Sequence, residues 1–429
     1  MTTFIVVGGF RDVLVSCCSQ EFGKGNLKQV GIIFHKGLVI YWTFAVAMLV
    51  ISTQIEHIFL ALGQDPDVSR MVGDNIIFFS IAMFPLAFHV VFMAFLQGQQ
   101  IVLPQVVSTF VTLVAHPLWC WIFMIHFDWE LKGAAFAYIL SNILAGGLTF
   151  LVVKFLGHCK ETLILPTKAS FKNYGDLIAL GVKNTLTLAL QWWIPQIGTF
   201  MVGLLGQAQL AAQVCVFQVQ LILVIIPDSL QLGGVSLAAY YAAQGKKNKF
   251  IHVSKLTILL GLTVMSIIVI LLFLVREPLA ILLNKDLEVS HLIISLFPYV
   301  FVYVFLEGYH YLVSIFLQAV GIYGPAVIFL FVNYYLIGLP CAYVLGFRYD
   351  HGIYGIWVGF IVGAIGECIC FTVYILLLNI DKEIERIQSM EHELEDAQEN
   401  ENVGKEIAKI QGSQNEIENQ NETTQATHV

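Results

Sequence analysis

The chain has 429 residues, of which 58% are hydrophobic and 12% are charged, whereas soluble domains carry about 25% charged residues. This balance excludes an ordinary soluble domain and predicts an integral membrane protein whose main partner is the lipid bilayer. The formal net charge of −8 arises at the end of the chain, because residues 381–429 hold 13 acidic and 4 basic side chains. Nothing in this distribution indicates the basic surface that nucleic acids require, so nucleic-acid binding is not expected.

Eleven apolar stretches follow one another along the chain. Most of them reach about 20 residues or more, the length that crosses a hydrocarbon core. The first is the shortest, and it carries Arg11 and Asp12 near its middle. We therefore predict an all-α integral membrane protein with about 11 transmembrane helices. The expected spans are 1–18, 30–53, 72–97, 101–126, 132–156, 178–205, 208–240, 250–275, 288–320, 322–347 and 352–380.

Lys and Arg residues divide unequally between the two sets of loops. The loops after odd-numbered spans hold ten of them, among them Lys24 and Lys246, and the opposite set holds five. Short loops rich in Lys and Arg face the cytosol. This pattern predicts that the tail after residue 380 is cytosolic. The expected location is the plasma membrane or a vacuolar or other internal membrane.

Two short segments recur along the chain. Residues 23–26 (Gly-Lys-Gly-Asn) recur as residues 245–248 (Gly-Lys-Lys-Asn), at an offset of 222. Residues 95–97 (Phe-Leu-Gln) recur as residues 316–318, at an offset of 221. Both glycine loops fall on the predicted cytosolic side, so we expect two parallel repeats, an architecture found in transporters with the substrate site between the halves.

These repeats predict four parts of the chain. Residues 1–157 form an N-terminal helical lobe, and residues 158–177, with Pro166 and several Lys, form a cytosolic linker. Residues 178–380 form the C-terminal helical lobe. Residues 381–429 are acidic and then rich in Asn and Gln, a composition typical of a largely disordered tail.

Several motifs resemble one known family. Residues 19–26 (SQEFGKGN) look like its Q-x-F-G-x-G loop, and residues 95–104 (FLQGQQIVLP) look like its F-L-Q-A-Q-x-I-V-x-P segment. Residues 190–193 (LQWW) resemble its L-E-W-W, and residues 333–340 (NYYLIGLP) resemble its eleventh helix. The family is multidrug and toxin extrusion (MATE), in its plant-like eukaryotic branch, and the resemblance covers about residues 8–380.

The resemblance implies a fold of two parallel-repeat bundles, and this chain departs from it in three places. The family has twelve helices, and residue 1 of this chain matches the start of the second. The resemblance therefore implies that the first family helix is missing, either because the gene model is truncated or because the N-terminal lobe is incomplete. Gln191 and Gln196 stand where the family has acids, and Gln cannot carry a titratable proton. Lys183 stands where a proline is usual.

Charged side chains in the middle of membrane spans are costly, and each one is a candidate functional residue. Glu307 lies within the span 288–320 next to Tyr309 and His310, and the resemblance implies a functional carboxylate there. The alternative is a structural acid whose charge His310 or a tyrosine satisfies. Asp228 follows Pro227, which kinks helices, and is a candidate second proton or cation site. Glu367 is expected to serve helix packing instead.

Polar and aromatic side chains complete the candidate site. Gln191, Gln196 and Trp192 either line the cavity, where the ring could stack on a flat cation, or serve helix packing. No metal or organic cofactor is expected, and the coupling ion is H⁺ or Na⁺. The candidate substrate-binding or ion-binding residues are Glu307, Asp228, Gln191, Gln196, Trp192, His310, Tyr309, Asn333 and Tyr334.

The leading hypothesis for function is export of small organic compounds, cationic or xenobiotic, by a monomeric antiporter with alternating access. Three alternatives from the same superfamily stay open, namely a flippase for lipid precursors, an exporter of organic anions and a homologue that does not transport. A membrane enzyme is disfavoured, because the chain has neither an Asp-rich diphosphate cluster nor a His-acid pair at a membrane face.

Overall fold

Helices joined by short turns make up the described part of the chain. The computed structural model describes residues 2–61 and 63–389, and this part contains no strand. The α-helices are α1 (Thr2–Lys24), α2 (Leu27–Ser52), α3 (Ile55–Ala61), α4 (Pro66–Ile81), α5 (Met83–Gly98), α6 (Leu103–Cys120), α7 (Glu130–Leu156), α8 (Gly175–Gly203), α9 (Gln207–Ala243), α10 (Lys247–Leu274), α11 (Arg276–Leu283), α12 (Leu287–Val313), α13 (Ile315–Gln318), α14 (Gly324–Leu330), α15 (Leu339–Tyr343) and α16 (Gly352–Leu377).

Four short helical segments of other types complete the described elements. A 3-10 turn, η2 (Lys168–Phe171), lies in the linker. The other three are π-helical, and they continue α6, α14 and α15 without a break. Proline removes a backbone hydrogen bond inside a helix, and Pro117 lies just before the first π-helical segment. The π-helical segments are η1 (Trp121–His126), η3 (Phe331–Gly338) and η4 (Val344–Arg348).

The predicted all-α membrane fold is confirmed. Among the described residues, nine continuous helical stretches are long and apolar enough to cross a membrane. The other two expected spans correspond to α1 and α8, which are helices of 23 and 29 residues with more polar side chains. The first span was predicted to end at residue 18, whereas α1 continues to Lys24. Its polar residues lie between other helices instead of facing lipid, so they do not end the helix.

The two halves of the chain repeat the same turns at one end of the bundle. Gly25, with φ of +88°, and Gly245, with φ of +69°, each follow a long helix and lead into the next one. The amide of Gly25 donates to Phe22 at 3.1 Å, and the amide of Gly245 donates to Ala242 at 2.9 Å. Gly25 and Gly245 are equivalent in the structure, because each is the left-handed residue that ends its helix. The offset between the two turns is therefore 220, and the offset of 222 expected from matching Gly23 with Gly245 is wrong here.

A second repeated turn lies at the opposite end. Asp128 and Asp350 adopt φ values of +55° and +58°, at an offset of 222. Each follows a π-helical segment, η1 or η4, and precedes a long helix, α7 or α16. The glycine turns share one end and these aspartate turns share the other, so the halves run in the same direction, as expected of parallel repeats.

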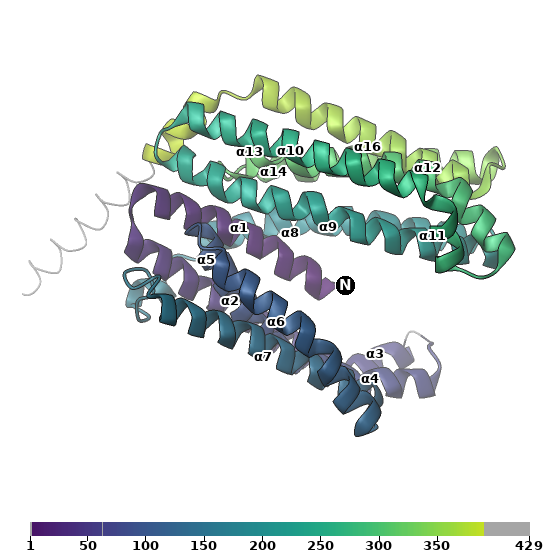
Figure 1. Cartoon of the computed structure of the whole chain (residues 1–429), viewed down its shortest axis with the longest axis horizontal. Coiled ribbons are helices and arrows are strands. Elements are labelled where there is room, and N and C mark those ends of the chain that lie inside the picture. The colour runs from purple at the N-terminus through teal and green to yellow at the C-terminus, as the bar shows by residue number, and fades with distance from the viewer. Residues whose placement is uncertain (1, 62, 390–429) are drawn as a thin grey trace, which may run out of the picture.

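The first helix lies between the two halves. Figure 1 shows α1 in purple, with α2 and α5 on one side and α8 and α9 on the other, and α1 packs against all four helices. Gly9 faces α8 so closely that a Cβ there would lie 2.6 Å from the Cα of Thr185. A helix in this position places its polar residues inside the protein, where partners from both halves can reach them.

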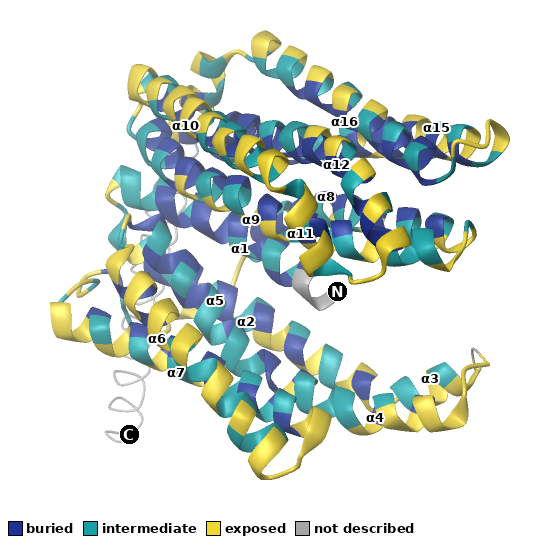
Figure 2. Cartoon of the chain, turned by 45° about the vertical axis from the view of Figure 1, so that its right-hand side comes forward, coloured by how far each residue is buried: buried dark blue, intermediate teal, exposed yellow. Residues whose placement is uncertain are grey.

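Each half has its own apolar core. One is built largely from the first half and includes Leu14, Phe92 and Phe95, and the other is built from the second half and includes Phe297 and Trp357. The outer surface is apolar as well, and Figure 2 shows exposed segments along α6, α7 and α10. This arrangement is expected when lipid, and not water, covers the outside.

The halves are hydrogen-bonded to each other at the glycine-turn end. The Ser16 hydroxyl on α1 donates to the carbonyl of Gln318 at 2.9 Å. The Ser236 hydroxyl on α9 donates to the carbonyl of Gln97 at 2.7 Å. The serines are related by an offset of 220 and the acceptors by 221, so the repeat produces a crossed pair of equivalent bonds. This pair ties the two halves together at one end only.

The beginning of the predicted tail is ordered and packed. Residues 380–389 form a helix whose Ile384 and Ile387 are 5% and 3% exposed and join a core with Phe250 and Phe316. The predicted domain boundary after residue 380 therefore falls at the start of a helix that belongs to the bundle. The expected disorder for the rest of the tail concerns residues 390–429, which lie outside the described residues.

This packing leads to a first prediction. Ile387→Ala should lower the free energy of unfolding by about 2–3 kcal/mol, because it removes buried apolar atoms and leaves a cavity. Asp381→Asn is the matched control in the same segment. Its 2.6 Å ion pair with Lys247 is exposed, and such pairs contribute about 0–1 kcal/mol. Thermal unfolding in detergent measures both, and equal melting temperatures for Ile387→Ala and the parent would contradict the packing role.

Candidate functional site

Glu307 lies inside the second half with amide groups as partners. It sits on α12 and is 5% exposed. The amide of Gln220 on α9 approaches its carboxylate at 3.4 Å, and Gln191 on α8 lies close enough to interact with the same carboxylate. Burial disfavours the charged form of a carboxylate, and neutral partners do not cancel that charge. This arrangement suits a group that binds and releases a cation or a proton.

A second buried carboxylate lies beside Glu307. Glu367 on α16 is 1% exposed, and its carboxylate lies 3.3 Å from Nε2 of His310 on α12. His310 thus lies next to Glu367 and not next to Glu307, so the alternative in which His310 neutralises Glu307 does not hold. Oε1 of Glu367 has no hydrogen-bond partner among the described residues. Tyr334 also interacts with the Glu367 carboxylate, and the packing role expected for Glu367 stays a prediction.

Three other predicted site residues lie on the surrounding helices. The Tyr309 hydroxyl forms a 2.8 Å hydrogen bond with Thr372 on α16, and Asn333 donates to the carbonyl of Phe329 at 2.8 Å. Tyr334 is 1% exposed and also interacts with Tyr303. Tyr309 therefore bonds a neighbouring helix, Asn333 bonds a carbonyl of its own helix and Cys370 of α16, and Tyr334 interacts with the carboxylate of Glu367.

Two predicted residues stay apart from Glu307 in the described contacts. Trp192 and Gln196 are half-buried on α8, which places them on a different part of the helix surface from the buried Gln191. Pro195 lies between them inside the same helix. Their role in substrate binding stays a prediction.

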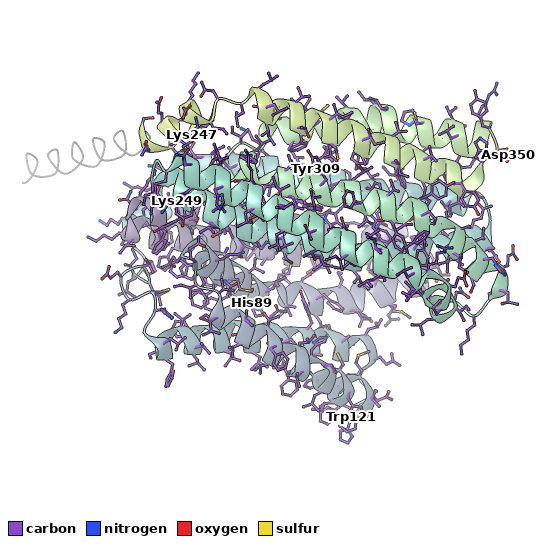
Figure 3. The ribbon with its side chains drawn as sticks, turned by 45° about the horizontal axis from the view of Figure 1, so that its top comes forward. His89, Trp121, Lys247, Lys249, Tyr309 and Asp350 are labelled. Carbon is purple, nitrogen blue, oxygen red and sulfur yellow. The ribbon has the colours of Figure 1, made fainter. Side chains whose placement is uncertain are left out.

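The depth of this site follows from its position between the two ends of the bundle. Figure 3 shows Tyr309 between Lys247 and Lys249 at the glycine-turn end and Asp350 at the opposite end. Tyr309 is two residues from Glu307 on α12. The carboxylate is therefore held within the membrane-spanning part of the bundle and away from both polar ends.

Asp228 lies in a separate group of charges between the halves. Arg11 on α1 bonds Asp12 through Nε and Nη2, both at 2.9 Å, and its Nη2 lies 3.7 Å from Asp228 on α9. Asn184 on α8 donates to Asp12 at 3.3 Å. Gly308 packs against Pro227, which brings α12 close to the part of α9 that carries Asp228. The site residues thus form two groups, one within the second half and one between the halves.

A small cavity lies between these two groups. Its volume is about 20 Å³, which is room for about one water molecule. Asp12 lines it from the first group, while Gln191 and His310 line it beside the second. Tyr311 and Gln231 also contribute to its wall. Apolar side chains, among them Leu188 and Phe371, also line it, so the cavity has a mixed wall in which Asp12 is the carboxylate.

Among residues 2–61 and 63–389, no group of three or more His, Cys, Asp or Glu side chains is placed to hold a metal ion. The polar groups of the site are carboxylates, amides and hydroxyls on helices.

Comparison with known proteins identifies the family. The MatE family model matches residues 1–122 and 185–344, which is most of the chain. The chain belongs to the MatE family. Its relatives include multidrug and toxin extrusion protein 1 of Xenopus tropicalis, at 27% identity over 390 residues, covering 90% of this chain and 68% of the relative. Protein DETOXIFICATION 14 of Arabidopsis thaliana is 25% identical over 406 residues, covering 93% and 84%.

A solved structure matches the fold of this MatE chain. The crystal structure of the eukaryotic MATE transporter AtDTX14 aligns with a TM-score of 0.84 and 22% identity, over 91% of this chain and 87% of that one. The resemblance to the eukaryotic, plant-like branch is therefore confirmed. The relatives are transporters, so the hypothesis of a membrane enzyme is set aside.

Several residues of this MatE site were not predicted as partners. Gln220 contacts Glu307, and Arg11 with Asp12 forms the group around Asp228. The rule that intramembrane charges are functional candidates applies also to Arg11 and Asp12, which lie in the first and shortest of the expected spans. It applies to Glu367 as well, although the neighbouring glycines Gly363 and Gly366 favoured a packing role for that residue.

Proposed function

We propose that this MatE chain is a secondary transporter that exports small organic compounds, above all cations, in exchange for protons or sodium ions. The names of its relatives, multidrug and toxin extrusion proteins, support an export function. The two parallel halves, hydrogen-bonded at the glycine-turn end, support alternating access of two lobes around a site between them. Glu307 is the proposed coupling residue.

The observation that carries this proposal is the environment of Glu307. Its carboxylate is buried and contacted by Gln220 and Gln191, so it has neutral partners and can exchange its charge state. A proton or sodium ion and an organic cation then compete for one negative charge, which is the basis of antiport. Exchange of one monovalent organic cation for one proton or sodium ion moves no net charge, so the ion gradient supplies the free energy. A tenfold ion gradient corresponds to about 1.4 kcal/mol and supports about tenfold accumulation.

The charges in the bundle favour cations over anions as substrates. The groups described above contain four carboxylates, Asp12, Asp228, Glu307 and Glu367, and one guanidinium, that of Arg11. A flippase for lipid precursors or an exporter of organic anions needs an excess of positive charge around its ligand. The described interior is therefore better matched to cations.

The sidedness and the cellular setting follow from the loop charges. Lys and Arg favour cytosolic loops, so the glycine turns and the helix 380–389 face the cytosol. Export then proceeds from the glycine-turn end to the end that carries Asp128 and Asp350. The transporter works as a monomer in the plasma membrane or in a vacuolar or other internal membrane.

Reconstitution tests the proposal directly. Vesicles with the full chain are loaded with tetraphenylphosphonium, and its efflux is followed after a proton gradient or a sodium gradient is imposed. One of the two gradients should accelerate efflux, and protein-free vesicles are the control. Efflux that matches the protein-free rate under both gradients would overturn the proposed function.

A further inference from the structure

The charged group between the halves has one more negative than positive charge. We refer to Arg11, Asp12 and Asp228 as the interlobe charge group. Arg11 and Asp12 lie on α1, and Asp228 lies on α9 directly after Pro227. Two carboxylates share one guanidinium, so the group keeps a net charge of −1 when all three are ionised.

Arg11 holds its two carboxylates with unequal strength. Its Nε and Nη2 both reach Oδ1 of Asp12 at 2.9 Å, within the normal range for charged hydrogen bonds. Oδ2 of Asp12 accepts from Asn184, so this carboxylate has partners on both oxygens. Asp228 lies 3.7 Å from Nη2, which is beyond hydrogen-bond length.

Exposure differs between the carboxylates in the same sense. The side chain of Asp12 is 8% exposed, whereas those of Arg11 and Asp228 are 31% and 34% exposed. Asp228 is therefore the loosely held and accessible acid. A charge inside the membrane domain is costly unless it is paired, and Asp228 has in Arg11 a partner that is only partly engaged.

The two partners belong to different halves of the protein. Arg11 lies on α1, which packs on α2 and α5 as well as on α8 and α9, and Asp228 lies on α9 in the second half. Movement of one half against the other changes the Arg11–Asp228 distance directly. A substrate that binds between the lobes, or a movement of the lobes, therefore changes the interaction between Arg11 and Asp228.

We propose that Arg11 is a tethered cation that determines substrate specificity. In the empty transporter Arg11 stays bonded to Asp12 and partly screens the charge of Asp228 from 3.7 Å away. A monovalent organic cation then binds Asp228 in competition with Arg11. The ligand class is a weakly hydrated organic cation, because the site supplies one negative charge and Tyr311 lies beside it. This inference rests on the proposed export of organic cations, and it adds the residue that competes with them.

Equilibrium binding to the purified full chain tests the competition without any gradient. Dialysis with radiolabelled tetraphenylphosphonium should show about tenfold tighter binding for Arg11→Gln, since removal of the competitor leaves Asp228 free. Arg11→Lys keeps the charge and should bind as the parent does. Asp228→Asn should bind about tenfold more weakly. Arg348→Gln, which removes an exposed arginine at the far end of the bundle, should leave binding unchanged.

The double variant decides whether Arg11 acts through Asp228. Asp228→Asn combined with Arg11→Gln should bind no more tightly than Asp228→Asn alone. Unchanged or weaker binding in Arg11→Gln would overturn the inference, as would loss of benzoate binding in that variant, which would mark Arg11 as an anion site. If Arg11→Gln does not fold, unchanged binding in Asp228→Asn overturns it equally.

The binding assay and the efflux assay can contradict the tethered cation and the proposed function separately. Arg11-dependent binding of tetraphenylphosphonium without gradient-driven efflux would keep the tethered cation and remove the proposed coupling. Gradient-driven efflux with the same affinity in Arg11→Gln and the parent would keep the transporter and remove the tethered cation.

Discussion

Replacement of Glu307 by glutamine should abolish gradient-driven efflux while the protein still folds. Glutamine keeps the shape and hydrogen-bonding capacity of the side chain, so Gln220 and Gln191 retain a partner. It cannot bind a proton or balance a cation, so the competition that couples the two fluxes disappears. In the vesicle assay, efflux from Glu307→Gln should be the same with and without the effective gradient.

Glu367→Gln provides the matched control for that experiment. Glu367 is also a buried carboxylate on the facing helix, and it lies 3.3 Å from His310. The same chemical change there should preserve the response to the gradient, because Glu367 lies beside His310 and Tyr334 and is not the proposed coupling group. Loss of the response in Glu367→Gln but not in Glu307→Gln would move the coupling site to the His310 pair. A full response in Glu307→Gln would make Glu307 structural.

Gly359→Ala should lower stability by about 1–3 kcal/mol, the usual cost of an extra methyl group in a packed core. Gly359 on α16 lies against α15, and a Cβ there would lie 2.5 Å from both the Cα and the Cβ of Ala342. Backbone atoms cannot rotate away, so the two helices must move apart. Small residues allow this close approach of membrane helices.

The chain offers a glycine of opposite character as a control. Gly147 lies inside α7, and nothing is within 4 Å of a Cβ placed there. Alanine favours helix more than glycine does by about 1 kcal/mol, so Gly147→Ala should keep or raise the melting temperature. Thermal unfolding by size-exclusion chromatography compares the two variants. A melting temperature for Gly359→Ala equal to that for Gly147→Ala would show that α16 and α15 are less tightly packed.

Under the proposed coupling of cation export to ion entry, the amide at Gln191 limits the number of ionisable groups around Glu307. Gln191 stands where the family resemblance implies an acid, and the structure places it beside Glu307. An acid at Gln191 would add a second charge to the same contact. With an amide there, Glu307 is the ionisable member of the contact with Gln191 and Gln220.

The sequence by itself determined the membrane class, the helices and the repeat. Apolar runs of bilayer length leave helices as the available structure, since the backbone must satisfy its own hydrogen bonds in lipid. The expected span 288–320 corresponds to the continuous helical stretch Leu287–Gln318. Glu307 was predicted as a site residue because an acid inside a membrane span is costly in any orientation. Its position within the apolar span 288–320 can be read from the sequence.

Only the tertiary structure decided the partners of the charged residues. Arg11 and Asp228 are far apart in the chain, and their contact depends on how α1 lies against α9. The pairing of His310 with Glu367 depends in the same way on the rotation of α12 against α16. Helix periodicity determines which residues share a face of one helix, but packing determines which faces meet. The role of a charged residue in an apolar span, such as Arg11, can therefore be assigned only when the packing shows its partners.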